Sequence, residues 1–128
     1  MRYRVRARPN SAERNNMKIL NKSESITERQ AYRLTHDGDC REVQKSEGAQ
    51  FDVKAFIHFI KPDKDEQDRE HLIMITEEEE AFVTQSPSVI LSFFDMMETF
   101  GLPIQNVEIV KKTNKKNGRE FFNLVLTD

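Results

Sequence analysis

The chain has 128 residues and a formal net charge of −2, and 33% of its residues are charged while 37% are hydrophobic. This length allows one hydrophobic core rather than two, and the hydrophobic content is too high for a wholly disordered chain. No apolar run approaches the roughly 18 residues of a membrane helix, and no signal-peptide core follows the first arginines. The single cysteine, Cys40, excludes an internal disulfide and indicates a reducing compartment.

Charge is unevenly distributed along the chain. Residues 1–22 contain seven basic side chains and one acidic one, and residues 63–80 contain nine acidic and two basic ones. Residues 111–119 contain five basic side chains and no acidic one. A basic surface can therefore meet a polyanion although the total charge is slightly negative.

The N-terminal segment has no hydrophobic period. Arginine alternates with other residues from Arg2 to Arg8, and Pro9 and several asparagines then interrupt the pattern. We therefore predict a flexible basic arm over 1–24 and one folded domain over 25–128.

A short helix is predicted over 26–35. Thr27 is its expected N-cap and Gln30 occupies the capping-box position three residues later. Ala31, Tyr32 and Leu34 are expected on its apolar face. An edge strand is predicted over 41–45, and because an edge can pair with a second copy, both a monomer and a dimer remain open.

The clearest strand spans 51–61, where apolar residues recur at every second position. The residues expected to face the core are Phe51, Val53, Ala55, Ile57 and Phe59. The intervening positions, including Lys54, Phe56 and His58, are expected on the opposite face.

A helix is predicted over 87–100 because Ser86 is a capping residue, Pro87 suits the first helical position, and Gly101 suits the end. Its apolar stripe comprises Val89, Ile90, Phe93, Met96, Met97 and Phe100. Strands are predicted around this helix over 71–77, 80–85, 106–113 and 119–127, the last two joined by a turn at Asn117-Gly118. This order predicts a mainly β fold with one or two helices, namely an OB-fold-like five-stranded barrel with a helix between strands three and four.

A set of aromatic and basic residues on the expected non-core faces forms the candidate site. Rings stack on unpaired bases and cations bind phosphates, so this combination is typical of single-stranded nucleic-acid binding. The candidates are Lys54, Phe56, His58, Lys111, Lys112, Lys115, Lys116, Arg119, Phe121 and Asn123. Two alternatives stay open: Phe56 packs under the 26–35 helix, and the lysine-rich turn is an ordinary solvated turn.

Catalysis is not predicted. His36, Asp37, Asp39 and Cys40 are close in sequence, but their spacing matches no zinc site. The acidic segment lacks the alternating ligands of a calcium loop, and the chain contains neither a glycine-rich phosphate loop nor a nucleophile elbow. We expect no enzyme activity, no cofactor and no metal.

The segment 81–88 (AFVTQSPS), the helix at 93–100 and the segment 107–122 (VEIVKKTNKKNGREFF) resemble single-stranded DNA-binding replication proteins of small tailed bacteriophages, including protein-primed ones. That family shows a similar strand ending in Ser-Pro, a helix, a basic hairpin and an aromatic last strand. The resemblance extends over 26–127 and departs from the family at Lys112 and in the acidic 63–70 loop. It implies coating of displaced single strands during viral DNA replication, in the cytoplasm of an infected host cell.

The predicted partner is therefore single-stranded DNA, with other replication proteins as further candidates and no membrane. Two other functions remain open at this stage. One is a protein-interaction module that uses the acidic 63–80 region, and the other is single-stranded RNA binding by the same basic surface.

Overall fold

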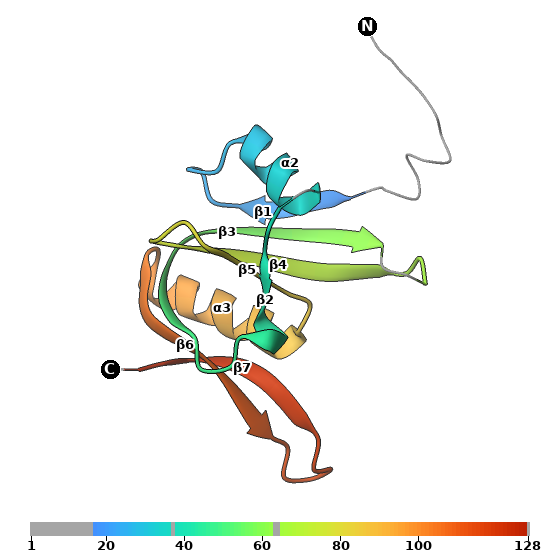
Figure 1. Cartoon of the computed structure of the whole chain (residues 1–128), viewed down its shortest axis with the longest axis vertical. Coiled ribbons are helices and arrows are strands. Elements are labelled where there is room, and N and C mark those ends of the chain that lie inside the picture. The colour runs from blue at the N-terminus through green and yellow to red at the C-terminus, as the bar shows by residue number, and fades with distance from the viewer. Residues whose placement is uncertain (1–16, 37, 63–64, 128) are drawn as a thin grey trace, which may run out of the picture.

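The computed structural model describes residues 17–36, 38–62 and 65–127, and within them it shows a mainly β fold with two α-helices (Figure 1). The strands are β1 (Lys18–Lys22), β2 (Arg41–Glu42), β3 (Gln50–Pro62), β4 (Asp68–Thr76), β5 (Ala81–Thr84), β6 (Ile104–Thr113) and β7 (Glu120–Leu126). The helices are α2 (Glu28–His36) and α3 (Pro87–Phe100), and a short 3-10 helix η1 spans Val43–Lys45.

The described strands form one curled sheet around β3. Six of them follow the order β2-β5-β4-β3-β6-β7, while β1 pairs with β3 beside this path. The second edge of β3 is shared, because residues 50–53 pair with β6 and residues 57–60 pair with β1. The sheet is mixed, since β2 runs parallel to β5 whereas the other pairs are antiparallel.

The sheet is a half-barrel, so the predicted closed five-stranded barrel is wrong although the predicted order of elements is confirmed. In the described part of the chain, no pairing joins β5 to β7, the contact that would close such a barrel. Both strands have other partners. β5 pairs with β2, and the Ser88 hydroxyl of α3 donates a 2.6 Å hydrogen bond to the Phe122 carbonyl of β7. A helix and a short parallel strand therefore occupy the edges that would otherwise meet.

Both faces of the sheet are covered by helices. On one face, α3 contributes Val89, Ile90 and Phe93 to a core with β3, β4 and β5. On the other face, α2 and the segment before it contribute Ala31 and Ile26 to a second core. Figure 1 shows α2 and α3 on opposite sides of the strands. This two-faced burial is the main feature that strand alternation alone does not reveal.

A bulge in β3 distributes its residues between the two cores. The pairing of β3 with β4 shifts between Val53 and Ala55, so Lys54 is an extra residue in the ladder. As a result, Phe51, Val53 and Phe56 belong to the α3-side core. The remaining predicted core residues, Ala55, Ile57 and Phe59, belong to the α2-side core. All five predicted core positions are buried, but Phe56 is buried as well, at 4% exposure.

The predicted helix caps are confirmed, although the first helix spans Glu28–His36 instead of 26–35. The Gln30 amide N–H donates to the Thr27 hydroxyl, and the Thr27 amide N–H donates to the Gln30 side chain, which is a reciprocal capping box. Ser86 caps α3, and Gly101 follows its last residue with a φ of 74°. Two predicted apolar positions are exposed instead, Tyr32 at 59% and Phe100 at 61%.

Two predictions for the N-terminal third need correction. Residues 18–22, expected within the arm, form β1, whose Ile19 packs against the α2-side core. The rest of that arm, residues 1–16, lies outside the described residues. The predicted 41–45 strand is limited to β2, because the chain then turns into η1 and buries Val43 in the α3-side core. None of the described helices is long and apolar enough to cross a bilayer.

Candidate nucleic-acid interface

The β6–β7 hairpin extends away from the rest of the molecule (Figure 1). Its base is anchored, because Val107, Ile109 and Leu124 are buried in the α3-side core. The segment at 46–49 runs beside this base and exchanges backbone hydrogen bonds with Ile109. Beyond the base of the hairpin, every residue from 111 to 120 is exposed. We call residues 111–119 the basic hairpin.

The turn of the basic hairpin is held by its own asparagines. The Asn114 amide N–H donates to the Arg119 carbonyl, and the Gly118 amide N–H donates to the Asn114 carbonyl. The side-chain oxygens of Asn114 and Asn117 accept from the amide N–H groups of Lys116 and Arg119. Gly118 has a φ of 72°, which glycine adopts without steric cost. The backbone that presents these cations is therefore ordered before any ligand binds.

Most cations of the basic hairpin are available to a ligand. Lys111 is partly neutralised, because its Nζ lies 3.8 Å from Glu47 and 3.9 Å from Glu120, and it sits 5.6 Å from the centre of the Phe122 ring. Four others make no ion pair with any residue in the described ranges, namely Lys112, Lys115, Lys116 and Arg119. A polyanion would therefore not need to displace an existing carboxylate from these four.

Phe121 of β7 lies next to this charge, near the tip of the hairpin. It is half-buried and stands directly opposite Lys112 in the ladder. Asn123 follows on the same face, and its side-chain oxygen accepts hydrogen bonds from the Ser92 hydroxyl and the Leu124 amide. Asn123 therefore attaches the hairpin to α3, with only its amide NH₂ left for a ligand.

The three candidates on β3 do not join this site. Phe56 is enclosed by Phe93 and Phe94, at ring distances of 5.4 and 5.6 Å, so it cannot stack on a base. Lys54 forms an ion pair with Glu79 and borders a cavity beneath α2. The His58 ring lies 2.8 Å from Glu70 through Nε2 and packs on Phe94. The expectation that Phe56 lies on an open face is therefore wrong, and so is the alternative of packing under the 26–35 helix, because Phe56 is buried under α3 instead.

No family model, curated protein or solved structure matches the chain. The resemblance to phage replication proteins stays a prediction.

One exposed surface was not predicted from the sequence pattern. Four residues of α2 are exposed on one side of the helix, namely Arg29, Tyr32, Arg33 and His36, which we call the α2 outer face. They occupy positions i, i+3, i+4 and i+7, so they share one side of the helix. The same spacing is visible in the sequence, but Tyr32 was assigned to the apolar side because the helix has few apolar residues to define that side.

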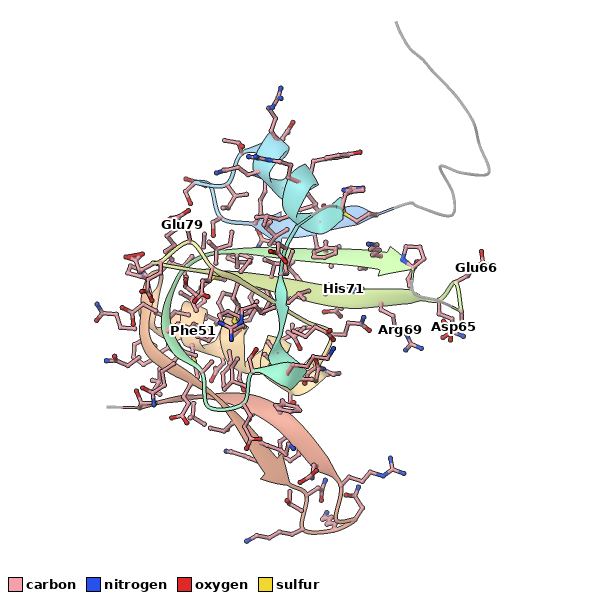
Figure 2. All side chains as sticks on the ribbon, in the orientation of Figure 1. Phe51, Asp65, Glu66, Arg69, His71 and Glu79 are labelled. Carbon is pink, nitrogen blue, oxygen red and sulfur yellow. The ribbon has the colours of Figure 1, made fainter. Side chains whose placement is uncertain are left out.

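The acidic 63–80 region is not one surface. Asp65 and Glu66 lie at one end of β4 and Glu79 lies at the other, as Figure 2 shows. In the second turn, Glu79 pairs with Lys54 and Glu80 pairs with Arg41 at 3.1 Å. A single basic partner would therefore have to bind two separate, partly neutralised turns.

The described residues contain no group of three His, Cys, Asp or Glu side chains that is arranged to hold a metal ion. Cys40 is a half-buried free thiol near Leu34. Burial, and then the neighbouring Asp39 carboxylate, raise the pKa of the Cys40 thiol. The thiolate is therefore disfavoured at neutral pH.

Proposed function

We propose that this protein binds single-stranded DNA through the basic hairpin and Phe121, without catalysis. The observation on which the proposal depends is the projecting hairpin, whose exposed cations Lys112, Lys115, Lys116 and Arg119 lack ion-pair partners among the described residues. When such cations bind phosphates, counterions are released from the nucleic-acid backbone, and this release favours binding. The resemblance of residues 107–122 to the hairpin of phage single-strand-binding proteins supports the same assignment.

The ring beside the cations favours an unpaired strand over a duplex. Phe121 is half-exposed next to Lys112, so a base that is not stacked in a helix can lie on its face while a neighbouring phosphate reaches the ammonium group. In a duplex both faces of each base are already stacked. Base–aromatic stacking contributes about 1–3 kcal/mol and does not depend strongly on sequence.

The charge contribution is tested by changing two lysines that lie at the tip. Lys115→Gln with Lys116→Gln should weaken binding to oligothymidylate and make the plot of log affinity against log salt shallower by about 1.4, because each single-strand phosphate contact contributes about 0.7. The measurement is a fluorescence-anisotropy titration at several salt concentrations. The matched control, Lys45→Gln with Lys61→Gln, removes the same charge from the body and should leave the slope unchanged. Equal losses in the two variants would show that only net charge matters.

The stacking contribution is tested at Phe121. Phe121→Ala should lower affinity for oligothymidylate by about 5- to 150-fold, which corresponds to the 1–3 kcal/mol of one stacked base. Phe121→Tyr keeps a ring and should bind like the wild type. Phe100→Ala removes a more exposed ring from α3, outside the hairpin, and is the control. If Phe121→Ala binds as tightly as Phe100→Ala, Phe121 does not stack on a base.

In this proposal the biological role is coating of single strands that are displaced during phage genome replication. A protein that binds only unpaired strands shifts the duplex equilibrium toward strand separation by mass action. Competition between DNA and RNA oligonucleotides of the same sequence separates this role from RNA binding. Tighter binding to the RNA would overturn the DNA assignment, since recognition of RNA uses contacts to the 2′-hydroxyl.

A further inference from the structure

The α2 outer face combines two rings and two guanidinium groups. The Tyr32 and His36 rings are stacked, with their centres 4.1 Å apart and their planes 16° from parallel. A contact between the His36 Nδ1 and the Tyr32 carbonyl, 2.9 Å long, fixes the orientation of the imidazole. The two rings therefore present a preformed π surface, of the kind on which unpaired bases stack.

The arginines on this face lie beside the ring pair. Arg29 and Arg33 are one helical turn apart, and both are exposed. Neither makes an ion pair with a residue in the part of the chain that the structure describes. Guanidinium groups bind phosphate in a bidentate manner and also stack on bases, so their position suits a nucleic-acid strand more than a neutral ligand.

A cavity adjoins the same face. It has a volume of about 510 Å³ between α2 and the sheet, and its polar edge carries Gln30, Arg33 and the ion pair of Lys54 with Glu79. Its apolar lining comes from Ile26, Leu34, Ala55 and Ile75. This volume is within the usual range of small-molecule sites. An apolar hollow with an amide and a guanidinium group at its edge can accept a base that is turned out of the strand.

We propose that the α2 outer face is a second binding site for single-stranded DNA, separate from the basic hairpin. Figure 1 shows α2 and the tip of the hairpin at opposite ends of the molecule. One protein molecule then holds two stretches of strand at the same time. The inference rests on the proposed function for the identity of the ligand, but it uses none of the hairpin residues.

The test counts short strands bound per chain. Hexathymidylate is titrated into the full chain at low salt, and the stoichiometry is measured by calorimetry or native mass spectrometry. The wild type should bind two hexamers. Tyr32→Ala with Arg33→Gln should bind one, and so should Phe121→Ala with Lys115→Gln and Lys116→Gln. The combination of all five changes should bind none. Because the changed α2 side chains are exposed, circular dichroism should show an unaltered fold.

The outcomes separate the two proposals. One hexamer on the wild type and one on the α2 variant would overturn the second site and leave the hairpin site intact. Loss of all binding in the α2 variant, with a hairpin variant that binds like the wild type, would overturn the hairpin site instead. Should circular dichroism show that Tyr32→Ala disturbs α2, Arg29→Gln with Arg33→Gln is used in its place. That variant keeps the ring pair and should weaken the second site at least 5-fold; an unchanged affinity would overturn it.

Discussion

Strand β3 and the β6–β7 hairpin have similar patterns of residue types but very different surroundings. Both alternate aromatic, aliphatic and basic residues, yet Phe56 of β3 is 4% exposed between two other rings while Phe121 of β7 lies half-exposed beside Lys112. β3 is the centre of the sheet and has a helix on each face. The tip of the hairpin has neither. Alternation thus identifies a strand, whereas elements distant in sequence decide whether its second face is available to a ligand.

The largest expected effect follows from this contrast. Phe56→Ala should lower the free energy of unfolding by about 3–5 kcal/mol, because it leaves a cavity between Phe93 and Phe94 in the α3-side core. Urea denaturation of the purified protein measures this change. Phe121→Ala should cost less, about 1–2 kcal/mol, since that ring is only partly buried. If the two variants are equally destabilised, the hairpin is packed as tightly as the body.

An effect of intermediate size is expected on stability when alanine replaces either of two glycines. A Cβ at Gly38 would lie 2.5 Å from the carbonyl oxygen of Leu34, so Gly38→Ala forces the backbone of α2 to move and should cost about 1–3 kcal/mol. A Cβ at Gly118 meets no atom within 4 Å, and only its φ of 72° opposes a side chain. Gly118→Ala should therefore cost about 1–2 kcal/mol.

Asparagine distinguishes the two mechanisms. It tolerates a positive φ, so Gly118→Asn should recover most of the stability that Gly118→Ala loses. Gly38→Asn places a larger group against the same carbonyl and should be at least as destabilising as Gly38→Ala. Thermal unfolding of the four variants measures this. Recovery at Gly38 would show that the close contact with Leu34 is not what limits the size of this residue.

Local signals predicted most of the elements. The capping box of Thr27 and Gln30, the Ser86-Pro87 start of α3 and the turn at Asn117-Gly118 act over a few residues, and the structure contains all three. Features that depend on distant partners were not predicted. β1 is mostly polar and is held by its pairing with β3, a strand distant in sequence, and no local pattern signals the bulge at Lys54.

In the candidate site, too, local features were predicted and features that depend on distant partners were not. The basic hairpin was predicted because its charge and its turn are both local to residues 111–119. Phe56 was misassigned because its burial depends on α3, some 30 or more residues away in the chain. Tyr32 was misassigned in the opposite sense, because a nine-residue helix that buries only Ala31 and Thr35 has a narrow core-facing side.

The smallest expected effect concerns the reactivity of the Cys40 thiol, which is half-buried. Burial and the Asp39 carboxylate raise the pKa of its thiol, so at neutral pH alkylation by iodoacetamide should be slower than for a cysteine introduced at the exposed hairpin tip, as in Cys40→Ser with Lys115→Cys. The rate of Cys40 should reach its half-maximum at a higher pH than the rate of the tip cysteine.

The same shift has a consequence for stability. Because folding favours the protonated thiol, its contribution is fully present below the pKa of an unfolded cysteine, about 8.5, and is lost as the pH rises through the higher folded pKa. The wild type should therefore lose more stability than Cys40→Ser between pH 8 and pH 10, in urea denaturation at each pH. Identical alkylation profiles for Cys40 and the tip cysteine would show that the Cys40 thiol is exposed to water. Cys40 would then not pack against the rest of the protein.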